Sequence, residues 1–336
     1  MTERSRLIEA FLAEAGWGDV PRRVLAADAS FRRYDRLAAA ERVAVLMDAP
    51  PPQEDVRPFL TVARLLQRMG LSAPAILAED VTAGLLLLED FGDRTYTRLL
   101  AAGADERALY RLAVDVLIAL HRAYEPGMAA LLPAYDEARL LAEAALLPDW
   151  YLPAVSDAPT PPAVRESYLA AWRQVLPKAA VLPPTLVLRD YHVDNLMLLE
   201  GRDGIGACGL LDFQDAVIGS PAYDLVSLVE DARRDVPEDL AAEMMDRYLA
   251  GFPEIDRAVF TTEAAVLAAQ RNCKIVGIFT RLCVRDGKPR YLEHIPRLWR
   301  LLDRDLAHPA LAPVKQWLDR HVPPALRRIP ACEAAP

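Results

Sequence analysis

The chain has 336 residues, of which 53% are hydrophobic and 26% are charged, the balance of a folded globular protein with one large or two modest domains. Its 39 basic and 48 acidic residues give a formal net charge of −9, which argues against nucleic acid or an anionic membrane as a partner.

Targeting and redox signals point to the cell interior. No stretch reaches about 18 apolar residues, and the first residues, MTERSRLIEAFLAEAGWGD, place charges between apolar positions at helical spacing. We therefore predict neither a transmembrane helix nor a secretory signal. Cys208, Cys273, Cys283 and Cys332 include no C-x-x-C pair, which predicts reduced thiols and no zinc site. We expect a cytoplasmic protein.

The first 90 residues combine short strands with two amphipathic helices. Leu7, Ile8, Phe11 and Leu12 share one face of a predicted helix over residues 3–15. The remaining patterns predict strands at 24–27, 34–37, 42–48, 75–77 and 84–88, and a second helix over 55–69.

The chain beyond residue 95 is mostly helical in pattern. Leu109, Leu112, Val116 and Leu120 repeat at steps of three and four, which predicts a buried helix face. Similar patterns predict helices at 135–147, 162–176, 221–231, 240–251 and 263–278, with strand segments only at 186–199 and 207–212. Strands first and helices afterwards predict an α+β fold with a small β-rich lobe and a larger, mostly helical lobe.

The segment LVLRDYHVDNLMLLEGRDGIGACGLLDFQDA, residues 186–216, carries the strongest chemical signal. Asp190 follows an apolar strand, Asn195 comes five residues later, and Asp212 ends a second apolar strand after a Gly-rich turn. A hairpin of this kind brings two carboxylates and an amide toward one point. Mg²⁺ prefers such oxygen ligands, and a remaining carboxylate can accept a proton from a hydroxyl.

The D-x-x-x-x-N motif, the strand that ends in Asp212 and the following G-S-P-A-Y-D-L resemble the aminoglycoside phosphotransferase/choline kinase family. The resemblance implies a two-lobed protein-kinase-like fold with an N-lobe (1–88), a hinge (89–94) and a helical C-lobe (95–336). It implies ATP as co-substrate, Mg²⁺ as cofactor and these site residues: Asp190 as catalytic base, Asn195 and Asp212 as metal ligands, Asp224 as a loop-fixing residue, and His192 and Asp194 as residues that orient the substrate or brace the loop.

Two upstream segments match the nucleotide site of this family. LLLLEDFGD resembles the hinge, where backbone groups near Glu89 and Phe91 would meet adenine. ASFRRY stands where a glycine-rich loop normally covers the phosphates, so the resemblance implies contacts from Ser30, Phe31, Arg32 and Arg33 instead.

The lysine that the superfamily places on the third strand is missing here. The first 177 residues contain no lysine, and strand 42–48 reads RVAVLMD. Glu54 remains as a candidate for the helix carboxylate that would normally pair with it. Arg32, Arg33 and Arg42 are the cations that can replace the lysine.

Six segments of the chain resemble bacterial kinases of N-acetylmuramate and N-acetylglucosamine. They are A-S-F-R-R-Y, V-L-M-D-A-P-P, L-L-L-E-D-F-G-D, R-D-Y-H-V-D-N-L-M, L-D-F-Q-D-A and Q-R-N-C-K-I-V-G-I-F-T-R-L. The resemblance implies phosphorylation of the anomeric hydroxyl to a sugar 1-phosphate during cell-wall sugar recycling. Arg271 or Lys274 would then meet the lactyl carboxylate of muramate, and Asn272 a sugar hydroxyl. A helix that packs its polar residues against the catalytic lobe explains the same three residues.

Two other readings stay open at this point. The acceptor can be an aminoglycoside, an amino alcohol or another sugar. The missing lysine also permits a nucleotide-binding module without catalysis, although Asp190, Asn195 and Asp212 together favour an active kinase.

Overall fold

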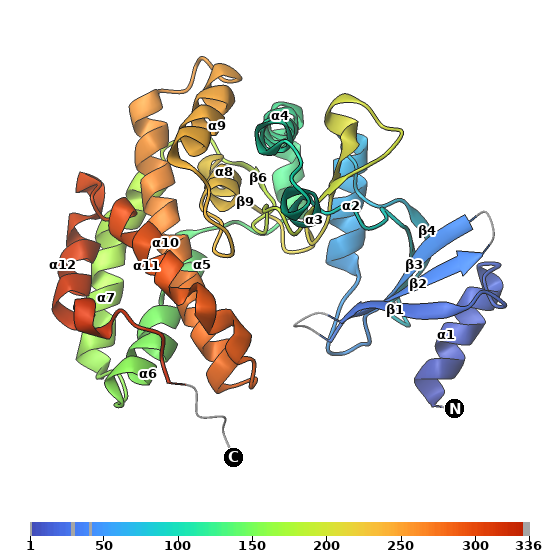
Figure 1. The fold of residues 1–336 in the computed structure, drawn as a ribbon, viewed down its shortest axis with the longest axis horizontal. Coiled ribbons are helices and arrows are strands. Elements are labelled where there is room, and N and C mark those ends of the chain that lie inside the picture. Colours follow the sequence, from blue (N-terminus) through green and yellow to red (C-terminus); the bar gives the residue numbers. More distant parts are fainter. Residues whose placement is uncertain (1, 28–30, 40–41, 332–336) are drawn as a thin grey trace. The chain divides into compact units, whose positions relative to one another are not determined.

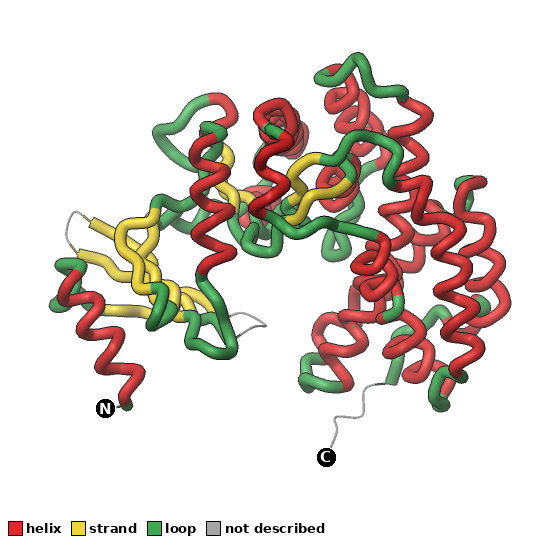
Figure 2. The backbone as a smooth tube through the Cα atoms, turned by 180° about the vertical axis from the view of Figure 1, so that it is seen from behind, coloured by secondary structure: helices red, strands yellow, loops and turns green. Residues whose placement is uncertain are grey.

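The computed structural model describes residues 2–27, 31–39 and 42–331 (Figure 1). The chain forms two compact units: unit 1 comprises residues 1–123 and 193–216, and unit 2 comprises residues 124–192 and 217–336. Figure 2 shows that strands are prominent in unit 1 and that helices dominate unit 2. The small β-rich and larger helical parts that the sequence predicts are therefore present.

Unit 1 is built on an antiparallel sheet with the strand order β1-β2-β3-β5-β4. Its elements are α1 (Glu3–Glu14), β1 (Arg22–Ala27), β2 (Arg33–Ala39), β3 (Arg42–Asp48), α2 (Arg57–Arg68), β4 (Ile76–Asp80), β5 (Leu85–Glu89), α3 (Tyr96–Ala101), α4 (Glu106–Ala123), β7 (Leu196–Leu198) and β8 (Cys208–Leu210). A short 3₁₀ helix (Gly204–Ala207) connects β7 to β8.

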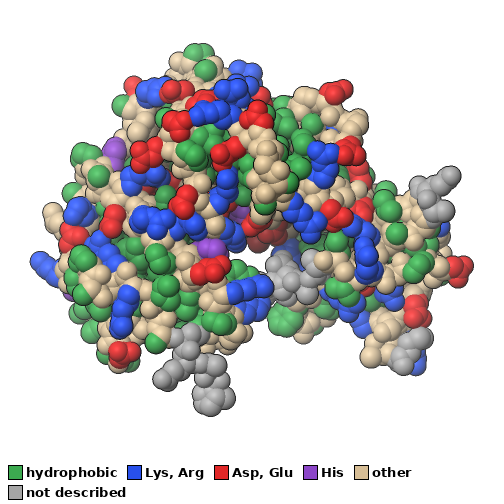
Figure 3. Space-filling model, in the orientation of Figure 1, with side chains coloured by type: hydrophobic (Ala, Val, Ile, Leu, Met, Phe, Trp, Pro, Cys, Tyr) green, Lys and Arg blue, Asp and Glu red, His purple; other side chains and the backbone are tan. Residues whose placement is uncertain are grey.

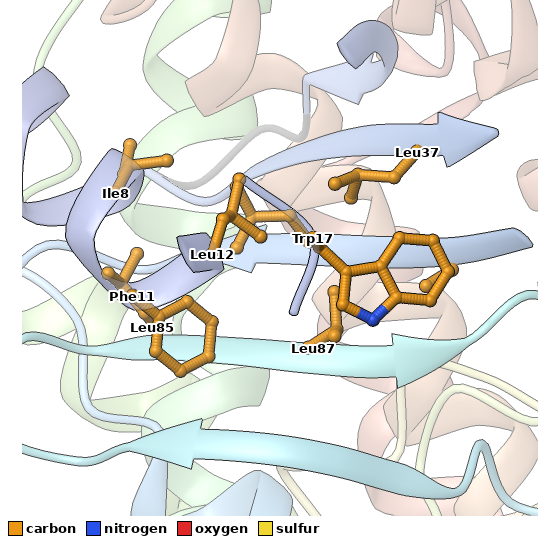
Figure 4. Close-up of a cluster of buried hydrophobic side chains, with 9 residues drawn as sticks. Ile8, Phe11, Leu12, Trp17, Leu37, Leu85 and Leu87 are labelled. Carbon is orange, nitrogen blue, oxygen red and sulfur yellow. The ribbon is translucent and has the colours of Figure 1, made fainter. Parts of the chain in front are cut away.

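Helix α1 covers one face of this sheet. Ile8, Phe11 and Leu12 from the helix and Trp17 after it pack on Leu37, Leu85 and Leu87 of the strands (Figure 4). Burial of each of these large apolar side chains stabilises the fold by roughly 1.5–3 kcal/mol. Thr2 caps the helix by accepting a hydrogen bond from the backbone N–H of Ser5.

The central strands are buried on both faces, which explains their unbroken apolar sequences. Ala44 and Leu46 of β3 belong to the cluster beneath α1, whereas Val45 points to the opposite face and lines a cavity. In β5, Leu87 and Leu88 divide in the same way. This alternation follows from the two-residue period of a strand.

Unit 2 is a helical body with one short strand pair. Its elements are α5 (Glu137–Ala144), a π-helix (Leu147–Tyr151), α6 (Leu152–Ser156), α7 (Pro162–Val175), β6 (Thr185–Val187), β9 (Val217–Gly219), α8 (Ala222–Val229), α9 (Glu238–Ala250), α10 (Arg257–Val284), α11 (Ile295–Asp305) and α12 (Ala312–His321). The 3₁₀ segments are Pro126–Leu131, Leu176–Ala179, Pro289–His294, Pro309–Leu311 and Pro324–Leu326.

Helix α10 is the longest element, and most of its residues from Phe260 to Cys283 are buried. Gly277 lets it approach the backbone of Leu146 closely, since a Cβ at this position would lie 2.3 Å from the Leu146 carbonyl carbon. The strand pair β6–β9 is antiparallel and places Leu186 opposite Ile218.

Three sequence expectations need correction. The predicted strand over 186–199 is two short strands, β6 and β7, with a loop between them, because Arg189–Asn195 is polar and carries the chemistry. Strand β9, which pairs with β6, was not predicted. The prediction of reduced cysteines holds for Cys208 and Cys273, which are free and buried, but is wrong for Cys283, which is disulfide-bonded.

The surface carries charges of both signs. Acidic and basic side chains lie among each other on the face shown in Figure 3, and surface pairs include Arg57–Asp55 and Arg165–Asp149. No helix among residues 2–27, 31–39 and 42–331 is both long and apolar enough to cross a bilayer.

Candidate active site

The β7–β8 hairpin of unit 1 brings Asn195 and Asp212 together. The strands are antiparallel with Leu196 opposite Leu210, and the backbone N–H of Leu211 donates to the Asn195 carbonyl oxygen at 3.0 Å. Asn195 Nδ2 therefore lies 3.5 Å from Asp212 Oδ2. The short hairpin thus explains why these two residues, which are apart in the sequence, lie next to each other in the structure.

The Asp212 carboxylate is partly exposed and has a defined hydrogen-bond partner. Its side chain is 37% exposed, and Gln214 donates to Oδ1 at 2.8 Å. Its backbone has φ of +56°, a left-handed conformation that costs a non-glycine residue roughly 1–3 kcal/mol. The strained backbone aims a partly exposed carboxylate, which is typical of a ligand site.

Arg32 is the cation that meets this carboxylate. Its guanidinium lies 3.9 Å from Asp212 Oδ1 and 3.8 Å from Glu54 Oε2, and its side chain is only 10% exposed. Glu54 also accepts a hydrogen bond from the backbone N–H of Phe31 at 3.0 Å, whereas the Phe31 ring is 71% exposed. Arg32 and Glu54 thus form the type of cation–carboxylate pair that the missing strand lysine normally provides.

The other two candidate cations have different partners. Arg33 donates to Asp35 at 2.9 Å, and Arg42 donates to the Gly16 carbonyl at 2.7 Å while its guanidinium covers the Trp17 ring. Ser30, the remaining predicted loop residue, lies outside the described residues.

A cavity of about 440 Å³ connects the predicted hinge with the Asn195–Asp212 pair. Its wall includes Val45, Phe59, Leu88 and Met197, all apolar, together with Glu89 and Phe91 of the hinge. Phe91 packs tightly over Gly209, where a Cβ would lie 2.8 Å from the ring. The cavity therefore offers an apolar slot together with oxygen-bearing side chains, among them Asn195 and Asp212.

Charged networks hold the hinge in place. Arg36 on β2 binds Asp90 at 2.6 Å and donates to Asp93 at 2.9 Å, and this hydrogen bond lowers the pKa of Asp93. Glu89 accepts from the backbone N–H of Ala75 at 3.1 Å and from Arg202. The Glu89 side chain therefore fixes the hinge, and its backbone N–H donates to the Ala75 carbonyl oxygen at 2.8 Å, so the predicted adenine contact at Glu89 would have to use its carbonyl.

Asp190 belongs to unit 2, where it follows β6. The residue before it, Arg189, has φ of +71°, and Asp224 holds the backbone of this strained turn. Asp224 accepts the backbone N–H of Leu188 at 2.6 Å and that of Arg189 at 2.9 Å. The predicted loop-fixing role of Asp224 is confirmed by these two hydrogen bonds.

Positive charges surround Asp190 within unit 2. Burial alone would raise the pKa of its carboxyl, but the charges of Lys274, His192 and Arg189 outweigh burial and lower that pKa below its ordinary value. His192 itself is 4% exposed, and burial lowers its pKa. Asp190 is therefore ionised at neutral pH, the state in which a carboxylate accepts a proton.

The predicted acceptor residues on α10 are buried and have defined contacts. Lys274 Nζ lies 3.2 Å from Glu143 Oε2 and 3.5 Å from the Tyr223 hydroxyl. Arg271 donates to the carbonyl of Glu230 at 3.2 Å. Asn272 is fully buried, and its amide nitrogen donates to Glu230 at 3.1 Å and to Asp305 at 2.9 Å. Asn272 thus has the contacts of a packing residue.

Asp194 lies on the other side of the unit boundary, in unit 1, where it accepts a hydrogen bond from the Thr97 hydroxyl at the start of α3. The boundary between the units falls between His192 and Val193. The structure thus groups Asn195, Asp212 and Arg32 in unit 1, and Asp190, His192, Arg271 and Lys274 in unit 2.

The donor set in unit 1 fits a hard divalent cation. Within residues 2–27, 31–39 and 42–331, no group of three or more His, Cys, Asp or Glu side chains is arranged to hold a metal by itself. Mg²⁺ in nucleotide sites takes only one or two protein oxygens and completes its shell with phosphates and water. The amide of Asn195 and the carboxylate of Asp212 match that requirement.

Comparison with known proteins agrees with this geometry. The sequence profile described as "Phosphotransferase enzyme family" matches residues 22–258. The chain belongs to this phosphotransferase family. This phosphotransferase is 41% identical to the N-acetylmuramate/N-acetylglucosamine kinase of Caulobacter vibrioides over 97% of this chain and 99% of that one. It is 42% identical to the protein of the same name from Pseudomonas aeruginosa, over 94% and 93% of the two chains.

Solved structures place the phosphotransferase in the kinase-like fold. A choline/ethanolamine kinase family protein from Mesorhizobium loti matches with a TM-score of 0.61 at 15% identity, over 93% of this chain and 99% of that one. The ADP-bound aminoglycoside phosphotransferase APH(2'')-Ib matches with a TM-score of 0.60 at 15% identity, over 90% and 98%. The predicted fold class and family are confirmed.

Several site residues could not be identified from the sequence alone. Glu143 and Arg36 stand in helix and strand patterns without any motif, and only the folded chain brings them to the loop before Asp190 and to the hinge. The pairing of Arg32 with Glu54 could be found in part, since a missing lysine obliges some other cation to serve the phosphates.

Proposed function

We propose that this phosphotransferase transfers the γ-phosphoryl group of ATP to the anomeric hydroxyl of N-acetylmuramate and N-acetylglucosamine, giving the sugar 1-phosphate. The observation that carries the proposal is the 41% identity, over nearly the full length of both chains, to a kinase named for these two sugars. A role in recycling cell-wall sugars in the cytoplasm follows from the identity of the substrates.

The cavity of unit 1 is the proposed nucleotide site, with residues 1–88 as N-lobe, 89–94 as hinge and 95–336 as C-lobe. Adenine would occupy the apolar slot beside Glu89 and Phe91, and the phosphates would extend toward Asn195 and Asp212. Asn195 and Asp212 would hold Mg²⁺, which neutralises phosphate charge when bound. Arg32 would supply the second positive charge on the phosphates, with Glu54 fixing its position. Phe31, Arg33 and Ser30 complete the proposed loop over them.

Asp190 is the proposed base. Its ionised carboxylate would accept the proton of the attacking anomeric hydroxyl, which is more acidic than the other hydroxyls of a sugar. Because phosphoryl transfer needs little covalent help, alignment of the hydroxyl and neutralisation of phosphate charge would provide most of the acceleration.

The charge around Asp190 favours an anionic or neutral acceptor over a cationic one. Lys274, Arg189 and Arg271 all act on Asp190 with positive charge. An ammonium ion has three donors, and the two contacts of Lys274 leave one N–H without a partner among the residues that the structure describes. That donor, with Arg271, is the proposed contact for the lactyl carboxylate. His192 and Asp194 are proposed to orient the sugar, and Asn272 to act through its packing.

The test is phosphorus NMR of reactions that contain ATP, Mg²⁺ and one acceptor each: N-acetylmuramate, N-acetylglucosamine, the neutral methyl glycoside of N-acetylglucosamine, an aminoglycoside, and choline. We expect a sugar 1-phosphate from the first two and nothing from the methyl glycoside, whose anomeric oxygen is blocked. Product from the methyl glycoside would overturn the anomeric assignment alone. Product from the cationic acceptors only would overturn the sugar assignment. Binding of ATP without any product would identify a non-catalytic module.

A further inference from the structure

Glu143 on α5 is the centre of a buried cluster beside the loop that carries Asp190. Its Oε1 accepts from Arg189 at 2.5 Å, and its Oε2 accepts from the Tyr135 hydroxyl at 2.5 Å and lies 3.2 Å from Lys274 Nζ. The Glu143 side chain is 14% exposed. The Tyr223 hydroxyl closes the cluster, 3.1 Å from that of Tyr135 and 3.5 Å from Lys274.

Each cation of this cluster is tied to Asp190. Arg189 is its immediate neighbour in the chain, and Lys274 exerts the largest favourable charge effect on the Asp190 carboxylate. A buried carboxylate with two cations and a hydroxyl on its two oxygens has three of its roughly four acceptor positions in use. Removal of its charge takes the directly bonded counterion away from Arg189 and Lys274, a change that is costly in a desolvated site.

The backbone at Arg189 needs such an anchor. A non-glycine residue with φ of +71° is strained, and strain of this kind persists only where the surroundings over-determine it. Asp224 holds the main chain of the turn through two N–H groups, and Glu143 holds the Arg189 side chain. The main chain at Arg189 is thus fixed by α8, and the Arg189 side chain is fixed by α5.

We infer that Glu143 is a positioning residue for phosphoryl transfer: through Arg189 and Lys274 it sets the place of the Asp190 carboxylate and the direction of the Lys274 ammonium. The inference deepens the proposed function, on which it rests. It assigns a task to a residue that carries no motif and that contacts no part of the proposed nucleotide cavity. An ion pair that merely joined α5 to α10 would contribute to stability without any selective effect on the Asp190 loop.

The kinetic test compares Glu143→Gln with Glu143→Asp and with the control Glu137→Gln. Glu137 lies on the same helix, is exposed and takes no part in the cluster. We expect Glu143→Gln to lower kcat by about 10- to 100-fold, since a misplacement near 1 Å costs about that much. The KM for ATP should change by less than about threefold, and Glu143→Asp should recover part of kcat. A loss shared by Glu137→Gln, or a rise in the KM for ATP as large as the fall in kcat, would overturn the inference.

A second measurement does not depend on activity. Hydrogen exchange of the peptide that spans residues 186–192 reports the amides of Arg189, bonded to Asp224, and of Asp190, bonded to the Leu188 carbonyl. We expect Glu143→Gln to accelerate exchange there by about tenfold or more while the β7–β8 hairpin stays unchanged. Unchanged exchange at 186–192 would overturn the inference. If the wild type phosphorylates no acceptor, the proposed function fails, and this exchange measurement still decides whether Glu143 positions the loop.

Discussion

The carboxylates of the candidate site differ between the two units. In unit 1, Asp212 is 37% exposed, and its contacts with Asn195 and Arg32 are long, at 3.5 and 3.9 Å. In unit 2, Asp224 is fully buried and accepts two backbone N–H groups at 2.6 and 2.9 Å. Glu143 is similarly enclosed by Arg189, Lys274 and Tyr135.

This difference indicates for which part of the reaction each unit is preorganised. The Asp212 carboxylate is partly exposed, so that phosphate oxygens and a metal ion can reach it. Groups around Asp190 already have their partners, so the carboxylate needs little reorganisation when a hydroxyl arrives. Unit 1 is arranged to receive ligands, and unit 2 is arranged to hold a base still.

The largest effect should come from the base. Asp190→Asn removes the proton acceptor while it preserves size, and we expect kcat to fall by about 10³- to 10⁴-fold. Affinity for ATP should change little because the cavity lies in unit 1. The measurement is ADP release coupled to a spectroscopic assay, with nucleotide binding followed in parallel by calorimetry.

Residual activity above about a tenth of the wild type would show that another group accepts the proton. Loss of nucleotide binding together with activity would instead indicate that the loop and the cavity depend on each other.

The next prediction concerns Arg32, which lies beside the partly exposed Asp212 of unit 1. Arg32→Met should lower kcat/KM for ATP by about 10²-fold, because one positive charge on the phosphates is lost. Arg33→Met should have a much smaller effect, since Arg33 is bonded to Asp35 and its side chain is 55% exposed. Arg64→Met, which removes an exposed α2 arginine paired with Glu79, is the control. Equal losses for Arg32→Met and Arg33→Met would mean that no single arginine replaces the missing lysine.

Asp224 should affect stability rather than catalysis. Burial raises its pKa from 3.8 to about 7. The folded state therefore favours the protonated carboxyl, and this contribution is complete below pH 3.8 and is lost as the pH rises toward 7. The free energy of unfolding of the wild type, relative to Asp224→Asn, should fall across that window by at most about 1.4 kcal/mol per pH unit.

Denaturant titrations of both proteins at several pH values between 4 and 8 measure this difference directly. A constant difference, or one that grows with pH, would show that the two backbone N–H groups keep Asp224 ionised throughout.

Much of this architecture can be read from local pattern. The unbroken apolar runs in RVAVLMD and LLLLE predict buried strands, and the steps of three and four from Leu109 to Leu120 predict α4. The adjacency of Asn195 and Asp212 follows from a short hairpin. In contrast, β9 was missed because a three-residue strand has too little pattern, and its partner β6 lies about thirty residues away in the chain.

By itself, the sequence determined the family, the order of strands and helices, and which carboxylates and amides stand at strand ends, because these depend on residue type and short spacing. Only the tertiary structure decided which arginine faces Asp212, that Asn272 is bound by Glu230 and Asp305, and that Glu143 joins Arg189 to Lys274. The physical reason is distance along the chain: Arg32 is 180 residues from Asp212, and Glu143 is 131 residues from Lys274. Contacts of that separation arise from packing, which no local pattern encodes.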